Sequence, residues 1–427
     1  MTQGEFIKVL DDWNFWHKEL DCGIEREFYL KKLQELVRKG FCTVVTGPRR
    51  VGKTYIMRQF LKKLINLGVS PRCTLFINFE DPRLTELNLT VLERLYQTYI
   101  ENLKPDNEVF LFFDEIQEVN HWEKWVLKML ELKRANIIIS GSNAKLLSRE
   151  LSTLLTGRHL DLTVMPLSFA EFLKFKEAEN SDVFTTKELF KDYIKFGGFP
   201  EVVLNKNKHE ILLSYLADIL EKDIIRRHNI RKREQIKSLL RFYLTNFSAM
   251  VTNRAVSKFL EINKDTVDKF SRYLEDAFLF SFVKRFSFKV KEIEKSARKV
   301  YSIDTGLSNA MDISLSENIG RHLENIVYLE LLRQKISSPE IEIYYFKETN
   351  TGEVDFVVKS GKGIKSLIQV CWDISDFRTR KREIKALLKA SETLKCDNLL
   401  IITEDREEEE RINGKTIKIL PILKFLQ

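Results

Sequence analysis

The first 175 residues alternate between short apolar runs and amphipathic stretches. The apolar runs are rich in β-branched and aromatic residues and predict strands at 41–46, 74–80, 109–113, 136–140 and 160–165. The run at 109–113 is apolar on both faces, as in a strand buried inside a parallel sheet. Residues 54–67 follow a helical pattern. Strands that alternate with helices in this way predict an α/β fold.

The pattern changes beyond residue 175. Helical periodicity predominates from 181 to 241, where the turn at 196–200 is marked by Gly and Pro. Further on, a helix is predicted to begin at Arg321, and strands are predicted at 353–358 and 367–372. The chain therefore has a helical middle and a second α/β region after it.

A glycine-rich loop follows the first predicted strand. Residues 47–54 match G-x-x-x-x-G-K-[ST] and stand between a strand and a helix, which is the setting in which this motif binds nucleotide phosphates. The glycines let the backbone curl, so that successive N–H groups and the positive helix end face a triphosphate. Lys53 would reach the β and γ phosphates, and Thr54 the magnesium ion. The predicted nucleotide-binding residues are Gly47, Pro48, Arg49, Arg50, Val51, Gly52, Lys53, Thr54 and Tyr55.

Two carboxylates end the apolar run at 109–113. Asp114 and Glu115 follow it directly, where a Walker B strand carries its acids. Asp114 would hold magnesium through water, and Glu115 would orient or deprotonate the attacking water. The pair could instead cap the next helix, but the phosphate loop upstream favours the catalytic interpretation. We therefore assign the metal to Thr54 and Asp114, and catalysis to Glu115 together with Lys53.

Polar residues beside two later strands complete the predicted site. Ser142 and Asn143 follow the run at 136–140, where an amide would sense the γ phosphate in an additional-strand ATPase; the alternative is a turn and helix cap. Arg158 precedes the run at 160–165 and would act as an arginine finger, in its own subunit or in a neighbour's. The alternative for Arg158 is a solvated surface group. We predict Asn143 and Arg158 as further catalytic residues.

Six motifs occur in order within the first 172 residues, at 47–54, 113–117, 122–123, 140–143, 155–158 and 166–172. Together they resemble the archaeal and bacterial AAA-like ATPases that carry a C-terminal DUF4143 domain, and the likeness covers nearly the whole chain. The resemblance implies an ATP-binding core of the AAA or STAND kind. It implies no particular biological process.

The predicted fold class is α/β, with an additional-strand, AAA-like P-loop NTPase core, a helical lid, a winged helix-turn-helix and a restriction-endonuclease-like C-terminal domain. The predicted domains are an N-terminal helical segment at 1–34, the ATPase domain at 35–175, a helical lid or linker at 176–235, the winged module at 236–303 and the DUF4143-type domain at 304–427.

Two short amphipathic stretches, 252–260 and 263–274, are joined by a tight turn and predict a helix-turn-helix. Apolar and polar residues alternate over 282–291, which with a returning strand at 299–303 predicts a two-stranded wing. We predict that residues 252–291 bind double-stranded DNA, with the second helix in the major groove. The alternative is a module that docks only on protein, because acidic residues dilute its positive face. The predicted DNA contacts are Lys264, Lys269, Arg272, Lys289 and Lys291.

The helix and strands near the C-terminus resemble the PD-(D/E)xK nuclease core. Glu324 and Asp355 match its helix and strand acids, whereas Gln369 replaces the second strand acid and Cys371 stands where the lysine belongs. A neutral amide is a poorer ligand for a hard cation, and a thiol supplies no fixed positive charge. We expect an inactive or weakened nuclease scaffold, unless Lys347 or Lys365 reaches the site from another strand.

Composition sets the remaining expectations. A hydrophobic content of 44% and a charged content of 31% are those of a globular protein, and 427 residues allow two to four domains. The apolar runs are too short to cross a membrane, and five scattered cysteines favour the cytoplasm. The net charge of +8 permits nucleic-acid contact without requiring it. The densest basic run, between Lys222 and Arg241, would face nucleic acid or nucleotide, or is a solvated helix face.

The predicted function is an ATPase with ATP and Mg²⁺ as cofactors, in which hydrolysis moves C-terminal domains that bind DNA or protein. Nuclease activity is not expected. A homo-oligomer would allow Arg158 to serve a neighbouring site. Two alternatives stay open: a slow nucleotide-dependent switch or adaptor without significant turnover, and a DNA-processing nuclease with an active C-terminal domain.

Overall fold

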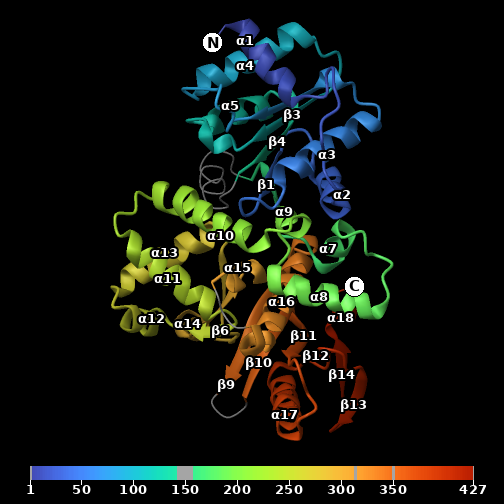
Figure 1. Cartoon of the computed structure of the whole chain (residues 1–427), viewed down its shortest axis with the longest axis vertical. Helices are drawn as coiled ribbons and strands as arrows, with labels where there is room; N and C mark the ends of the chain where they lie inside the picture. Colours follow the sequence, from blue (N-terminus) through green and yellow to red (C-terminus); the bar gives the residue numbers. More distant parts are fainter. Residues whose placement is uncertain (1, 142–156, 312–314, 349–351, 427) are drawn as a thin grey trace. The chain divides into compact units, whose positions relative to one another are not determined.

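The computed structural model (Figure 1) describes residues 2–141, 157–311, 315–348 and 352–426, and only the backbone of 315–318. The chain divides into two compact units, Met1–Val164 and Met165–Gln427. In the described part of the chain, no helix is long and apolar enough to span a membrane.

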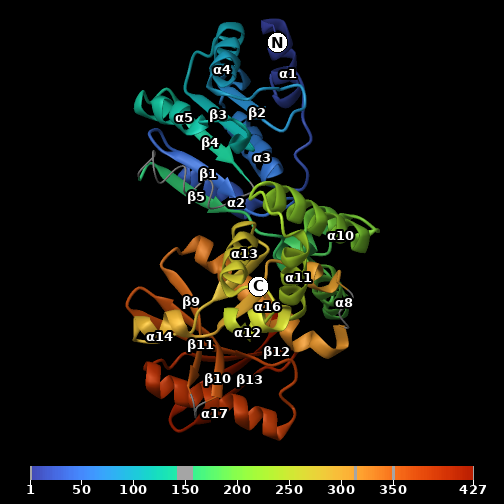
Figure 2. The ribbon, with the colours of Figure 1, turned by 90° about the vertical axis from the view of Figure 1, so that its left-hand side faces the viewer.

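A five-stranded parallel sheet forms the centre of the first unit, in the order β2-β3-β4-β1-β5. Figure 2 shows β1 and β5 side by side at one edge of this sheet. The strands are β1 (Cys42–Thr46), β2 (Thr74–Asn78), β3 (Val109–Asp114), β4 (Ala135–Ser140) and β5 (His159–Thr163). The helices are α1 (Gln3–Trp13), α2 (Glu27–Leu36), α3 (Lys53–Asn66), α4 (Leu89–Leu103) and α5 (Trp122–Glu131), with short 3₁₀ turns at Pro71–Cys73 and Ile116–Glu118. The predicted parallel-sheet core is confirmed.

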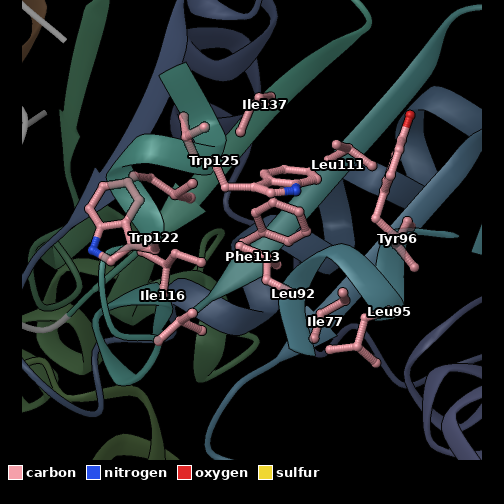
Figure 3. Close-up of a cluster of buried hydrophobic side chains, with 14 of the residues drawn as sticks. Ile77, Leu92, Leu95, Tyr96, Leu111, Phe113, Ile116, Trp122, Trp125 and Ile137 are labelled. Atoms are coloured by element: carbon pink, nitrogen blue, oxygen red, sulfur yellow. The ribbon is translucent and has the colours of Figure 1, made fainter. Parts of the chain in front are cut away.

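Aromatic packing fixes the strand that carries the acidic pair. The ring of Phe113 on β3 packs against Trp125 of α5 with the centroids 5.6 Å apart, and Trp125 in turn meets Tyr96 of α4 at 5.4 Å (Figure 3). Phe113 is fully buried. Because burial of such rings removes large apolar areas from water, α4 and α5 hold β3 rigidly up to Asp114.

The second unit begins with a run of helices. They are α7 (Phe169–Phe175), α8 (Val183–Phe196), α9 (Pro200–Leu204), α10 (Lys208–Asp218), the π-helix η3 (Ile219–Arg226) and α11 (Arg233–Thr245). Helices α8 and α10 pack against α15 (Thr305–Asn309), and α8 also packs against α16 (Leu315–Ser337). The segment predicted as a lid is therefore packed within the same unit as the C-terminal region.

The turn at Gly197 and Gly198, between α8 and α9, packs directly against the side chain of Asp304. A Cβ atom on Gly197, whose φ is +74°, would lie 1.8 Å from Oδ1 of Asp304. The backbone N–H of Gly198 donates to Oδ2 of Asp304 at 2.7 Å, and that of Gly306 donates to Oδ1 at 2.9 Å. Burial raises the pKa of Asp304 to about 7. The glycines at this turn let the backbone come close enough to satisfy a buried carboxyl group.

The two amphipathic stretches form α12 (Asn253–Leu260) and α13 (Lys264–Asp276), as the sequence predicts. The Thr252 hydroxyl caps α12, and the Asn263 amide oxygen caps α13. The two helices lie in the chain between the first and second strands of a three-stranded antiparallel sheet, which has the order β6-β8-β7. Its strands are β6 (Ala249–Val251), β7 (Phe280–Val283) and β8 (Arg298–Ser302).

The predicted strand over 282–291 is wrong beyond Val283. The backbone N–H of Phe286 donates to the carbonyl of Tyr345 at 2.7 Å, which draws the chain away from β8. Only Phe286 of the alternating apolar residues is buried, whereas Phe288 and Val290 are 75% and 73% exposed. A short helix, α14 (Val290–Lys295), takes the place of the outer part of the wing.

A six-stranded mixed sheet completes the second unit, in the order β13-β14-β12-β11-β10-β9. Helix α17 packs on β10 and β11, and α16 contacts β9, β11 and β8 (Figure 1). The strands are β9 (Ile341–Glu348), β10 (Gly352–Ser360), β11 (Gly363–Val370), β12 (Leu399–Thr403), β13 (Glu408–Ile412) and β14 (Lys415–Pro421). The further helices are α17 (Phe377–Leu394) and α18 (Ile422–Phe425).

A histidine is buried in the N-terminal half of α16. The side chain of His322 is fully buried and packs against Phe247, with the ring centroids 4.6 Å apart. Among the residues that the structure describes, neither ring nitrogen has a hydrogen-bond partner. Burial lowers the pKa of His322 to about 4. This side chain is therefore neutral at physiological pH.

Replacing His322 with leucine should reduce the acid sensitivity of the second unit. The unfolded histidine takes up a proton near its ordinary pKa of about 6.5, while the folded one resists protonation down to pH 4. The stability that the neutral ring provides is present above pH 6.5 and is lost as the pH falls to 4, a loss of about 3 kcal/mol. Urea unfolding of both proteins at pH 7 and pH 4 measures it. His209→Leu, which replaces a partly exposed histidine, is the matched control. Equal pH dependence in His322→Leu and the parent would contradict the assignment.

Candidate nucleotide-binding site

The phosphate loop curls tightly between β1 and α3. A Cβ atom on Gly47, whose φ is +139°, would lie 2.2 Å from the carbonyl oxygen of Val164, so only glycine fits there. Gly52 takes a left-handed conformation, with a φ of +91°, immediately before α3. Arg50 also has a positive φ, of 72°. These three positions bend the backbone into the concave turn that the motif predicts.

Lys53 points back into the loop. Its ammonium group donates to the carbonyl oxygens of Gly47 at 3.1 Å and Pro48 at 3.0 Å. The same nitrogen lies 3.9 Å from Oε1 of Glu115. The side chain of Lys53 is only 5% exposed. A positive charge is thus fixed at the mouth of the loop, beside the N-terminus of α3, where an anion is favoured.

The side chain of Asp114 on β3 is hydrogen-bonded to helix α3 and to strand β4. The Thr54 hydroxyl donates to Oδ2 of Asp114 at 2.6 Å, and the Ser140 hydroxyl donates to Oδ1. The contact with Ser140 arises because β4 pairs with β3, with Phe113 opposite Ile139. Burial, and then the neighbouring charge of Glu115, raise the pKa of Asp114 to about 6. A nearby cation would favour the charged carboxylate.

This pair of side chains fits a magnesium ion. A carboxylate and a hydroxyl are hard oxygen ligands, and Mg²⁺ commonly takes only one or two protein ligands and completes its shell with phosphates and water. In the described ranges no group of three or more His, Cys, Asp or Glu residues is arranged for a metal ion. Thr54 and Asp114 would therefore hold the metal jointly with the nucleotide.

Glu115 is held in a strained turn directly after β3. Its φ is +53°, which is uncommon for a residue with a side chain. Its backbone N–H donates to the Ser140 hydroxyl at 3.1 Å, and its Oε2 accepts from the Gln117 amide at 2.5 Å. Ser140 therefore contacts both acidic residues. The sequence pattern did not indicate this role of Ser140, because the role depends on the pairing of β4 with β3.

Other loop residues are supported by neighbouring elements. Arg49 donates to Oε1 of Glu80 at 2.9 Å, beyond the end of β2. Tyr55 is 42% exposed, and a Cβ atom on Gly23 would lie 3.1 Å from its ring. Arg26, which is buried, donates to the carbonyl of Val51 at 3.0 Å. No local pattern in the sequence indicated this support from Arg26.

Of the two remaining predicted catalytic residues, Asn143 and Arg158, the structure describes only Arg158. Asn143 and Ser142 lie outside the described residues. The carbonyl of Arg158 accepts from the N–H of Cys42, at the start of β1, so Arg158 lies at the edge of the sheet opposite the phosphate loop. The five residues of β1 span about 16 Å, longer than an arginine side chain. Arg158 instead pairs with Glu131 at 3.5 Å. An arginine finger at Arg158, in its own subunit or in a neighbour's, stays a prediction, and this position favours the neighbouring subunit.

The nuclease-like residues come together around a lysine that the sequence did not single out. Glu324 and Asp355 both contact Lys299 of β8. Gln369 accepts from the backbone N–H of Asp355 at 3.3 Å. Lys347 contacts Oε2 of Glu353 at 3.3 Å and Sδ of Met250 at 3.9 Å.

Neither the other candidate, Lys365, nor Cys371, which stands at the lysine's position, supplies the missing positive charge. Lys365 is exposed on β11. The thiol of Cys371 donates to the carbonyl of Asp373 at 3.1 Å, and burial raises its pKa to about 11. A neutral thiol at this position provides no positive charge for phosphate or water.

The predicted DNA-contact residues all lie on the surface. They are Lys264, Lys269, Arg272, Lys289 and Lys291. Two of them are partly neutralised, because Arg272 pairs with Asp268 at 2.5 Å and Lys289 with Glu292 at 3.4 Å.

The basic run before this module is neutralised in a similar way. Lys222 pairs with Asp218 at 3.2 Å, and Arg226 and Arg233 both pair with Glu221. These contacts favour the solvated helix face for that run.

Comparison with known proteins gives three matches along the chain. Residues 40–173 match a family described as an AAA domain. Residues 187–318 and 319–425 match two domains of unknown function, DUF8612 and DUF4143.

Two relatives align along almost their whole length. An uncharacterized protein of Methanocaldococcus jannaschii is 37% identical over 422 residues, which cover 94% of this chain and 90% of that protein. An uncharacterized protein of Haemophilus influenzae is 30% identical over 412 residues, which cover 94% of this chain and 98% of that protein.

The similar solved structures are more distant. The replication initiator DnaA bound to AMPPCP and single-stranded DNA has 14% identity and a TM-score of 0.28, and the match covers 58% of this chain and 86% of that one. AMPPCP-bound DnaA from Aquifex aeolicus has 16% identity and a TM-score of 0.29, with 76% and 99% covered. Likeness at these scores carries no functional argument.

Proposed function

The chain belongs to the family that joins an AAA domain to a C-terminal DUF4143 domain, and from this premise we propose that it binds ATP with Mg²⁺ and hydrolyses it to ADP and phosphate. The proposal rests on one observation. The hydroxyls of Thr54 and Ser140 both donate hydrogen bonds to the carboxylate of Asp114, beside the buried ammonium of Lys53. These groups come from three elements, α3, β3 and β4, and meet at the carboxyl edge of the parallel sheet.

Binding of the triphosphate would use groups that the fold already orients. The N–H groups of the loop and the N-terminus of α3 face the phosphates, and Lys53 exchanges its two loop carbonyls for phosphate oxygens. Mg²⁺, when bound with ATP, neutralises phosphate charge. The hydroxyl of Thr54 and the carboxylate of Asp114 would hold it, with Ser140 orienting the carboxylate.

Glu115 is the residue proposed to activate water. Its carboxylate lies between the Lys53 ammonium and the Gln117 amide, so its orientation is fixed by two partners. From this position it would accept a proton from water, or orient that water to attack the γ phosphorus in line with the oxygen of the departing ADP. After hydrolysis, the contacts to the γ phosphate would be lost. Their loss would allow the lid and the C-terminal domains to move, and so would couple hydrolysis to movement.

Measurement of ATP binding and turnover tests this function. Calorimetry should detect binding of Mg-ATP to the purified chain, and steady-state assays should detect phosphate release, with or without duplex DNA. A slow switch would bind ATP but turn over far below about one per second even when stimulated. Absence of heat with both Mg-ATP and Mg-GTP would contradict the proposed site.

We further propose that α12 and α13 present a DNA-binding face, because both helices are capped and Lys264, Lys269 and Arg272 are exposed on α13. Replacing Lys264 and Lys269 with alanine together should weaken duplex binding and reduce the slope of log affinity against log salt by about 2, one for each phosphate contact. Lys222→Ala is the control, since Lys222 pairs with Asp218 at 3.2 Å. Fluorescence anisotropy across a salt series measures both quantities. Absence of affinity at low salt would identify the module as a protein-docking element.

A further inference from the structure

The amide of Gln117 lies against the carboxylate that we propose to activate water. Its Nε2 atom donates to Oε2 of Glu115 at 2.5 Å. The other carboxylate oxygen, Oε1, lies 3.9 Å from the ammonium of Lys53. Because an ionised carboxylate only accepts hydrogen bonds, the amide of Gln117 turns its nitrogen towards Glu115 and its oxygen away. The contact with Glu115 therefore leaves the amide oxygen for another partner.

That amide oxygen is buried without a hydrogen bond. Within the described ranges of the chain, no donor reaches Oε1 of Gln117. A buried acceptor that lacks a donor has lost its hydration and gained nothing in return, so it weakens the fold. Such atoms are rare in folded proteins, and a catalytic role is one of the few reasons for which they are retained. The position of this oxygen, on a side chain bonded to Glu115, points to such a role.

The backbone restricts where the amide of Gln117 can lie. Glu115 has a φ of +53° and is followed by the 3₁₀ turn Ile116–Glu118. The backbone N–H of Val119 donates to the carbonyl of Ile116 at 3.0 Å, which closes this turn. Ile116 and Val119 are both buried in the apolar core, where Figure 3 shows Ile116. Because the chain is anchored on both sides of Gln117, the contact between its side chain and Glu115 is held by the fold.

Water that attacks a phosphate needs a fixed direction as well as a base. A water molecule has two O–H donors, and an ordered one commonly has two to four polar partners. The carboxylate of Glu115 and Oε1 of Gln117 are two acceptors on side chains that are bonded to each other. One water molecule could therefore donate to both. An amide oxygen takes up no proton at neutral pH, so Gln117 would orient the water and Glu115 would accept the proton.

We propose that Gln117 is a positioning residue for ATP hydrolysis, which holds Glu115 through its amide nitrogen and the attacking water through its amide oxygen. This inference rests on the function proposed above. In the step itself, the water oxygen forms a bond to the γ phosphorus while the bond from that phosphorus to the ADP oxygen breaks, and the electron pair leaves with ADP. One water proton passes to Glu115, and the other, directed towards Gln117, stays on the released phosphate.

The test is the turnover of a Gln117→Met protein, in which a side chain of similar length has no donor and only a weak acceptor. Its kcat should fall by about 10- to 100-fold, the size of a lost hydrogen bond to a charged group, while KM and Kd for Mg-ATP should stay within about twofold. Phosphate-release assays and calorimetry measure these quantities. Gln97→Met is the matched control, because Gln97 donates to Oε1 of Glu93 at 2.9 Å on the surface of α4, and kcat should stay at the parental value.

Two further measurements separate positioning from a purely structural role. The midpoint of urea unfolding should be the same for Gln117→Met and the parent, because the lost hydrogen bond is offset by removal of the unpaired buried acceptor. In single-turnover assays, adding Gln117→Met to Glu115→Gln should lower the rate far less than Gln117→Met does alone, since residues that act on one water molecule as a unit are not additive. A structural residue would lower the midpoint and multiply the effect of Glu115→Gln.

The outcomes distinguish this inference from the function on which it rests. If the parent hydrolyses ATP and Gln117→Met does so at the parental kcat, the inference on Gln117 is overturned and the proposed function stands. A loss of kcat that multiplies fully with the effect of Glu115→Gln, or that accompanies a lower unfolding midpoint, also overturns the inference alone. A parent protein that binds no Mg-ATP, or releases no phosphate from it, overturns both.

Discussion

Lys53→Ala is expected to weaken binding of Mg-ATP by roughly 30- to 150-fold. In the folded chain the Lys53 ammonium is 5% exposed and already directed into the loop, so its alignment with phosphates costs little reorganisation. Hydrogen bonds from a charged donor contribute about 2–3 kcal/mol, which corresponds to that change in affinity. Isothermal titration calorimetry measures the dissociation constants of both proteins.

The matched control is Lys62→Ala on the same helix. Lys62 pairs with Glu19 at 2.7 Å on the surface of the first unit, and its removal should leave the affinity for Mg-ATP unchanged. Unfolding curves of both variants show whether a loss of affinity reflects the missing ammonium group or a loss of folding. Equal affinities of Lys53→Ala and the parent would show that the nucleotide binds elsewhere.

Local sequence was sufficient to predict the residues that meet at the candidate nucleotide site. The loop at 47–54 and the acids at 114–115 each follow an apolar strand directly, and the parallel order of β1, β4 and β3 brings their ends to one edge. Thr54 and Asp114 are 60 positions apart, yet both follow from recognisable strand ends. The motif fixes the backbone conformation locally, so little depends on distant packing.

Contacts between residues that lie far apart in the sequence could not be predicted from local motifs. Ser140 meets Asp114 only because β4 lies next to β3, and a sequence pattern does not state which strands are neighbours. Lys299 lies 25 positions from Glu324 and 56 from Asp355, and its own segment looks like an ordinary strand. The wing prediction failed for a related reason, since a tertiary contact between Phe286 and Tyr345 overrides the alternating pattern.

Glu115→Gln is expected to keep ATP bound and to lower turnover by about 10²- to 10⁴-fold, which is the usual contribution of a general base. The substitution keeps the shape of the side chain and its contact with the Gln117 amide, while it removes the carboxylate that would accept a proton from water. Lys53, Thr54 and Asp114 are untouched, so binding of Mg-ATP should change little. Phosphate release at saturating ATP, together with calorimetry of Mg-ATP, separates the loss of catalysis from a loss of binding.

The control for this prediction lies at the other end of the same strand. Glu108 precedes β3 and contacts Lys39 at 3.2 Å on the surface, far from the phosphate loop, so Glu108→Gln should turn over ATP at the parental rate. Each of the two variants loses one carboxylate, so they differ only in the position of that carboxylate. If Glu115→Gln and Glu108→Gln both retain full turnover, Glu115 is not the residue that activates water. If Glu115→Gln instead loses ATP binding, the carboxylate serves mainly to position Lys53, which lies 3.9 Å away.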